Sequence, residues 1–104
     1  MPRFAANLSM LFTEVPFLER FALAAQHGFD AVECQFPYTC SAAEVKSALD
    51  HNHLTMVLHN LPAGNWQRGE RGIACHPDRV KEFRAGVQQS IEYAQTLGVQ
   101  QLNC

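Results

Sequence analysis

The sequence lacks the signals of a nucleic-acid-binding protein and of a membrane protein. Its 8 lysines and arginines are outnumbered by 10 aspartates and glutamates, which gives a formal net charge of −2 at pH 7. Proteins that bind nucleic acids usually carry a basic patch or stripe, and none is visible here. The apolar runs are far too short to span a bilayer. We therefore expect no nucleic-acid partner and no membrane partner.

The sequence also shows no secretory signal and no paired cysteines. The opening MPRFAANLSMLF has one arginine and a short apolar segment, interrupted by Asn7 and Ser9, and it has no convincing cleavage site. None of the four cysteines forms a CxxC pair; they are Cys34, Cys40, Cys75 and Cys104. Free thiols in the reducing cytoplasm are therefore expected.

What the sequence does contain is a regular alternation of strand and helix patterns. Short apolar segments predict strands over residues 3–8, 30–35, 54–59 and 99–104. Apolar residues at helical spacing predict three helices between them, beginning at Pro16, after Ser41 and at Pro77. Ser41 and Glu44 have the spacing of a capping box, and Gly28 and Gly98 follow the first and last helices, where a left-handed cap is expected.

The order βαβαβαβ predicts an α/β fold with parallel strands and right-handed crossovers. A doubly wound sheet would have a glycine-rich turn after its first strand, but Ser9, Met10, Leu11 and Phe12 follow that strand here. Polar residues gather instead at the carboxyl ends of the strands, where a (β/α)8 TIM barrel places its chemistry. We therefore expect residues 1–104 to be one domain, the N-terminal part of such a barrel, with about three and a half of its eight units.

The longest connection runs from His59 to His76, HNLPAGNWQRGERGIACH, between an apolar strand and the last helix. Loops of this length inside a compact chain are usually functional. Its three glycines permit backbone angles closed to other residues. Glu70, between Arg68 and Arg71, has the position to form a small polar network.

This loop resembles that of the hydroxypyruvate isomerase family, sugar-isomerase-like TIM barrels. The similarity rests on His59–Gly64 (HNLPAG), Trp66 and Gly69–Cys75 (GERGIAC). The opening FAANLSMLF, the EFR of the last helix and the final LNC match the family's pattern as well. The resemblance extends over essentially the whole chain.

The resemblance implies isomerisation of a small hydroxy-oxo acid, hydroxypyruvate to tartronate semialdehyde (2-hydroxy-3-oxopropanoate), through an enediolate. A divalent metal, with Mg²⁺ expected, would polarise the oxygens while a carboxylate moves the proton. In the family the catalytic glutamates and the metal ligands lie on later strands, so we place neither within these 104 residues. The substrate-binding residues implied here are His59, Arg71, Glu70 and Asn7, with Arg71 suited to bidentate pairing with a carboxylate.

Each of these residues also has a purely structural interpretation. His59 is about equally suited to be a hydrogen-bonded core histidine, and Arg68 and Arg71 to pair with Glu70 at the surface. Trp66 is either a lid over a pocket or a plug under the loop. Glu33, a charge on a buried strand, implies a site or a salt bridge. Asn7 and Asn103 are equally suited to cap loops.

Two other chemistries have weaker support. Cys34, Cys40, His51 and His53 form a zinc set on paper, but structural zinc sites usually have more closely spaced pairs. A nucleophilic Cys75 lacks any partner whose geometry can be argued.

Three alternative functions remain at this point. The first is a 2-oxo-tetronate isomerase of the same family. The second is a non-catalytic fragment that binds a small acid, or that forms a homo-oligomer through an unpaired sheet edge. The third, a relative of barrel-fold DNA repair nucleases, is disfavoured by the acidic charge balance.

Overall fold

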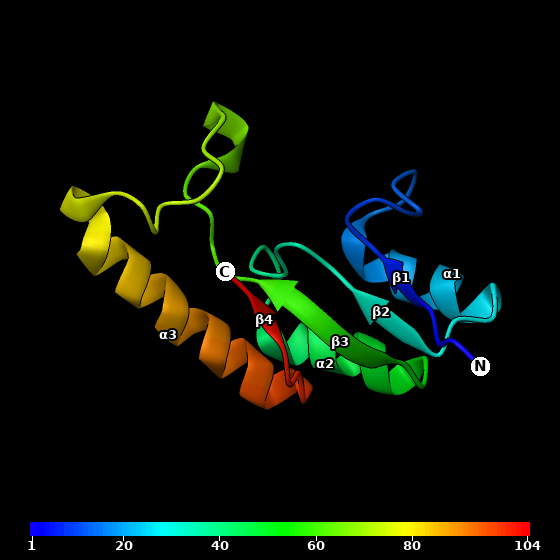
Figure 1. The fold of residues 1–104 in the computed structure, drawn as a ribbon. Helices are drawn as coiled ribbons and strands as arrows, with labels where there is room; N and C mark the ends of the chain where they lie inside the picture. Colours follow the sequence, from blue (N-terminus) through cyan, green and yellow to red (C-terminus); the bar gives the residue numbers. More distant parts are fainter.

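The computed structural model describes all residues from 1 to 104 and contains four strands, three α-helices and three short 3₁₀ turns (Figure 1). The strands are β1 (Ala5–Asn7), β2 (Ala31–Glu33), β3 (Thr55–Asn60) and β4 (Leu102–Asn103). The helices are α1 (Arg20–Gln26), α2 (Ala42–His51) and α3 (Val80–Leu97), and the 3₁₀ turns are η1 (Phe17–Glu19), η2 (Trp66–Arg68) and η3 (Pro77–Arg79).

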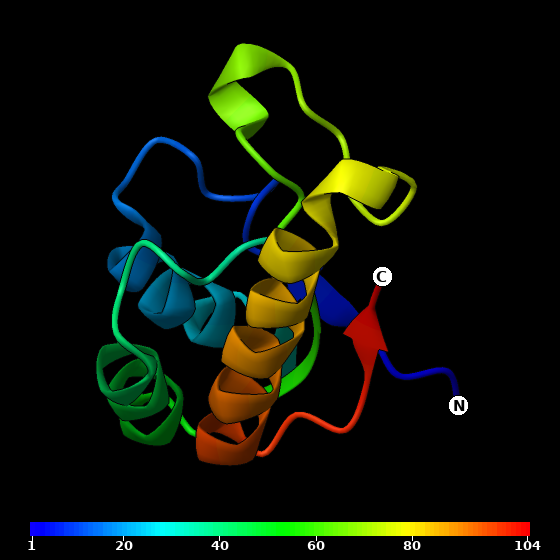
Figure 2. The same ribbon diagram turned by 90° about the vertical axis from the view of Figure 1, so that its left-hand side faces the viewer.

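The strands form one parallel sheet in the order β1-β2-β3-β4. All three helices lie on the same side of this sheet (Figure 2). Right-handed crossovers that always step to the next strand in one direction must leave every helix on one face, whereas a doubly wound sheet has helices on both faces. The predicted α/β architecture, parallel strands of a partial barrel, is confirmed.

The hydrophobic core lies between the sheet and the helices. Its fully buried side chains come from alternate strand positions, such as Ala6 on β1 and Val32 on β2, and from the facing sides of α1 and α2, such as Phe21 and Leu49. Because side chains alternate across a strand, burial of Ala6 and Val32 against the helices turns Asn7 and Glu33 to the opposite face. That opposite face is the interior side of the partial barrel.

Local sequence signals account for the helix ends. The predicted capping box of α2 is present: the Ser41 hydroxyl accepts the Glu44 N–H, and the Glu44 carboxylate accepts the Ser41 N–H. The predicted first and last helices each begin with a 3₁₀ turn, η1 and η3, before the α-helix proper. Most strands are shorter than the segments predicted for them, because only residues that pair with a neighbouring strand belong to the sheet.

No helix of the chain combines the length and the apolar character that crossing a membrane requires. All four cysteines are unpaired; Cys34 is buried, and Cys75 and Cys104 are exposed.

Candidate functional site

Four polar side chains line the carboxyl-terminal edge of the sheet on its interior face. Asn7 of β1 is the register partner of Glu33 on β2, and Asn60 of β3 is the register partner of Asn103 on β4. Register partners point to the same face. Glu33 pairs with Leu58, across an irregularity between Val32 and Glu33. Each strand therefore ends in a polar residue that faces the barrel interior.

Asn7 and Glu33 are joined by a hydrogen bond. Nδ2 of Asn7 donates to Oε1 of Glu33 at 3.0 Å, and Oδ1 of Asn7 accepts the Ser9 N–H at 3.0 Å. Asn7 thus both caps the following loop and faces the interior, which combines its two sequence-based interpretations. Within residues 1–104 Glu33 forms no salt bridge, because no cationic side chain of the chain lies within ion-pair distance of its carboxylate.

The ring of His59 lies on the other face of β3, between the sheet and α3. It has no exposed surface, and its Nε2 lies 3.4 Å from the carbonyl oxygen of Ser90. Its Nδ1 is buried without any hydrogen-bond partner. Direct contact with a substrate would need the ring to leave this position, so its predicted role as a substrate ligand stays a prediction. Its neighbour Asn60 faces the interior instead.

Burial lowers the pKa of His59 below its usual range, and the Ser90 carbonyl opposes that shift only in part. The unfolded chain then binds a proton at higher pH than the folded chain does. We therefore expect the free energy of unfolding to be constant above about pH 6.5 and to fall as the pH decreases below it. Urea titrations at pH 7.5 and 5.5 check this. His59→Gln should remove most of the decrease, and the exposed control His76→Gln should not; equal decreases in both variants would contradict the assignment.

A buried network holds the end of β3. The Tyr38 hydroxyl donates to the Asn60 carbonyl and lies 2.6 Å from the Ser90 hydroxyl, which has no exposed surface. Because Tyr38 has a single proton to donate, Ser90 donates to Tyr38. The network fixes the Asn60 backbone from the helix side, while its side chain accepts from Nδ2 of Asn103 at 3.2 Å.

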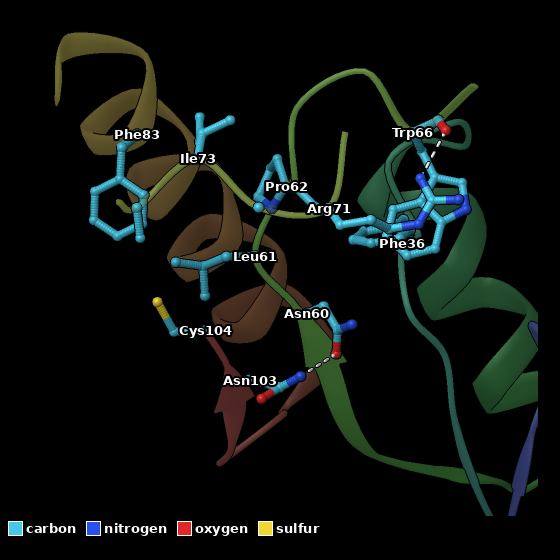
Figure 3. A pocket seen from close by; sticks show the side chains of 13 residues that line it. Phe36, Asn60, Leu61, Pro62, Trp66, Arg71, Ile73, Phe83, Asn103 and Cys104 are labelled. Carbon is cyan, nitrogen blue, oxygen red and sulfur yellow. Dashed lines mark hydrogen bonds between the residues drawn. The ribbon is translucent and has the colours of Figure 1, made fainter. Parts of the chain in front are cut away.

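A pocket of about 240 Å³ lies above the ends of β3 and β4, under the long loop (Figure 3). Its size suits a small acid better than a drug-sized ligand. Asn60 and Asn103 lie together at one side, Leu61, Ile73, Phe83 and Cys104 form an apolar side, and Arg71 projects towards Phe36 and Trp66 (Figure 3).

Arg71 is the cation of this pocket. Its guanidinium carbon lies 3.7 Å from the centre of the Trp66 ring, which in turn packs on Phe36 with 4.9 Å between ring centroids. Nη1 donates to the carbonyl oxygens of Trp66 and Glu70 at 3.0 and 2.8 Å. Nε and Nη2 have no partner within the chain, so one edge of the guanidinium is free to pair with a carboxylate. Trp66, which is 40% exposed, lines the pocket.

Glu70 is turned away from Arg71. Its carboxylate accepts two hydrogen bonds from Arg79, at 2.9 and 3.1 Å, and one from the Asn65 N–H. These bonds lower the pKa of Glu70, with the Arg79 bond as the largest cause. The alternative in which Glu70 pairs with Arg68 or Arg71 is wrong. Glu70 ties the middle of the loop, at Asn65, to Arg79 at the start of the last helical segment. Whether Glu70 also contacts substrate stays a prediction.

The residues of this chain do not form a metal site by themselves. No group of three or more His, Cys, Asp or Glu side chains comes together in a way that could hold an ion. Within the zinc set weighed from the sequence, burial raises the pKa of the Cys34 thiol to about 12. A zinc ligand must be a thiolate, and this environment opposes its formation.

Sequence reasoning noted Asn60 among the polar residues at the strand ends but assigned it no role, and it assigned none to Tyr38 or Arg79. Asn60 adjoins His59, and an alternating pattern would have separated them. The run Met56–Leu58 is apolar throughout, so it carries no such pattern. Tyr38 and Arg79 act over 22 and 9 residues of separation, and no local motif marks contacts of that kind.

The curated relatives of this chain are isomerases. The chain is 57% identical to hydroxypyruvate isomerase of Escherichia coli (strain K12) over 104 residues, which is 100% of this chain and 40% of that protein. It is 52% identical to 2-oxo-tetronate isomerase of Cupriavidus necator over 98 residues, 94% of this chain and 38% of that protein. The chain thus spans about two fifths of the length of these relatives.

A solved structure and a family model agree on the architecture. The crystal structure titled AP endonuclease, family 2, from Brucella melitensis superposes with a TM-score of 0.94 at 51% identity, over 98% of this chain and 40% of that one. The family model described as xylose isomerase-like TIM barrel matches residues 21–104. The chain therefore belongs to the xylose isomerase-like TIM barrel family.

Proposed function

We propose that these residues form the first part of an isomerase that interconverts hydroxypyruvate and tartronate semialdehyde. The observation that carries the proposal is the 57% identity to the E. coli hydroxypyruvate isomerase over the whole chain. The 2-oxo-tetronate isomerase of C. necator is less similar, at 52% identity over 98 residues. We therefore propose hydroxypyruvate, rather than a 2-oxo-tetronate, as the substrate. We do not propose a nuclease activity like that named for the Brucella melitensis protein, because the net charge of −2 does not favour binding of DNA.

In this proposal the pocket binds and orients the substrate. The free edge of Arg71 pairs with the substrate carboxylate, and the Asn60 and Asn103 amides hydrogen-bond its oxygens. The loop and Trp66 exclude water, which strengthens these interactions. Asn7 faces the same interior from β1. Glu70 contributes by holding the loop that presents Arg71.

The proton transfer itself needs groups from outside residues 1–104. Isomerisation removes a proton from the carbon that bears the hydroxyl and returns one to the neighbouring carbon, through an enediolate. A carboxylate base is required near those carbons. Mg²⁺, the cation we propose, supplies electrostatic stabilisation of the oxygens when bound. The ligands of the cation also come from outside these residues.

We further propose that the protein is cytoplasmic, because its four free thiols would stay reduced there.

A chimera tests the proposal on these residues directly. In the chimera, residues 1–104 replace the aligned part of the E. coli hydroxypyruvate isomerase. The alignment covers the whole of this chain. We expect the chimera to interconvert the two acids with kcat/KM within about tenfold of the parent, a difference of about 1.4 kcal/mol in activation free energy. Nuclear magnetic resonance of ¹³C-labelled hydroxypyruvate follows the conversion.

The control exchanges the same segment from the C. necator 2-oxo-tetronate isomerase into the same host. If residues 1–104 help to select hydroxypyruvate, the two chimeras differ in their ratio of kcat/KM for hydroxypyruvate and a 2-oxo-tetronate. A folded chimera without activity towards hydroxypyruvate would overturn the proposal. We expect the isolated residues 1–104 to bind the acid without converting it, because in this proposal the catalytic carboxylates come from outside these residues.

A further inference from the structure

We infer that Glu33 and Asn7, paired at the carboxyl ends of β2 and β1, form a receptor for a hydroxyl group of the substrate. The inference rests on the proposed function and adds a second anchoring point to it. Arg71 would hold the carboxylate end of the acid, and the Glu33–Asn7 pair would hold the hydroxyl end.

The orientation of both side chains is fixed. Register pairing of Asn7 with Glu33 places them side by side on the interior face. The Ser9 N–H holds Oδ1 of Asn7, so the amide nitrogen must point to Glu33, whose Oε1 accepts it. One N–H of Asn7 and Oε2 of Glu33 remain without a partner in the chain. A donor and an acceptor thus stand next to each other, which is what a hydroxyl group needs.

A hydrogen bond between β1 and β2 does not require a charged side chain at position 33. Glu33 is half-buried, lies in no ion pair and receives a single hydrogen bond from an uncharged amide. A neutral glutamine would join β1 to β2 without the cost of desolvating a charge. A hydroxyl that donates to a carboxylate makes a short, charge-assisted bond. A ligand hydroxyl that donates to this carboxylate would account for the charge.

The segment that follows β2 connects the two anchors. Phe36 follows Glu33 by three residues, past a bend at Gln35. Phe36 lines the pocket and packs on Trp66, on which the Arg71 guanidinium lies. The segment after β2 therefore leads from the hydroxyl receptor to the Arg71 side of the pocket.

Binding of two unreactive acids tests the inference. D-Glycerate and D-lactate differ only in the terminal hydroxyl, and calorimetry measures their Kd values with the full-length protein that contains these residues. We expect glycerate to bind about tenfold more tightly than lactate. In Glu33→Gln this preference should fall to about twofold while the Kd of lactate stays unchanged. Glu14→Gln, the same loss of charge at an exposed position without hydrogen-bond partners, should keep the tenfold preference.

The outcomes separate this inference from the proposed function. An unchanged preference for glycerate in Glu33→Gln, or no preference in the parent protein, overturns the hydroxyl receptor. A preference that depends on Glu33 supports it even in a protein that fails to isomerise hydroxypyruvate, since binding is measured without turnover. A lactate Kd that rises as much as the glycerate Kd shows a general loss of pocket structure and also overturns the inference.

Discussion

Replacing Arg71 by alanine is expected to lower kcat/KM for hydroxypyruvate by about 100-fold or more in the full-length protein. The free edge of the guanidinium offers two parallel N–H groups to a carboxylate, and charge-assisted pairs of this kind contribute the most among hydrogen bonds. A 100-fold loss corresponds to about 2.7 kcal/mol of transition-state stabilisation. The loss should appear mainly in KM, because the carboxylate is held equally in the ground state and the transition state. Steady-state kinetics measure it.

Two further variants sharpen this test. Arg71→Lys keeps the charge but loses the planar fork and the contact over the Trp66 ring, so it should recover only a small part of the affinity. Arg68→Ala removes a neighbouring exposed cation of the same loop, whose side chain makes no hydrogen bond, and should leave the kinetics within about twofold. Equal losses in the Arg68 and Arg71 variants would show that only the net charge of the loop matters.

Replacing Gly64 by alanine is expected to release the loop. Its φ of +84° is strained for any residue with a Cβ, which costs about 1 kcal/mol. The new Cβ would also overlap the Glu70 carboxylate and lie 2.9 Å from Cγ2 of the buried Ile73. We expect a total cost of about 3 kcal/mol. Amides of residues 64–73 should then exchange with solvent about 100-fold faster, as hydrogen exchange measures.

Gly69 provides the matched control. Its φ is +91°, but a Cβ there meets no atom within 4 Å. Gly69→Ala therefore carries the backbone strain without the clash and should raise the exchange rates less than tenfold. If both variants behave alike, the Glu70 carboxylate does not lock the loop.

Features with a local cause were predictable from the sequence. The apolar stripe of α3, the Ser41–Glu44 capping box and the alternation of elements each depend on residues a few positions apart. The partial barrel followed from the order of these elements, since parallel neighbours with right-handed crossovers leave few topologies. Arg71, which was named from the resemblance of its loop, does line the pocket, and its role towards a substrate stays a prediction.

Features that depend on contacts across the chain were not predictable. The register of β3 against β2 decides which of His59 and Asn60 faces the barrel interior. This register includes an irregularity that no local sequence pattern marks. The partner of Glu70 is Arg79 rather than its neighbours in sequence, because the loop folds back onto the start of α3. In both cases the local sequence allowed several partners, and packing selected one.

The closed loop has a consequence for the entropy of binding. Glu70 already ties the middle of the loop to Arg79 before any acid arrives, and the guanidinium of Arg71 already lies on the Trp66 ring. An incoming molecule therefore freezes few additional backbone and rotamer states. Affinity in such a preorganised pocket is governed by what the ligand loses, namely its own hydration and tumbling, rather than by what the protein must give up.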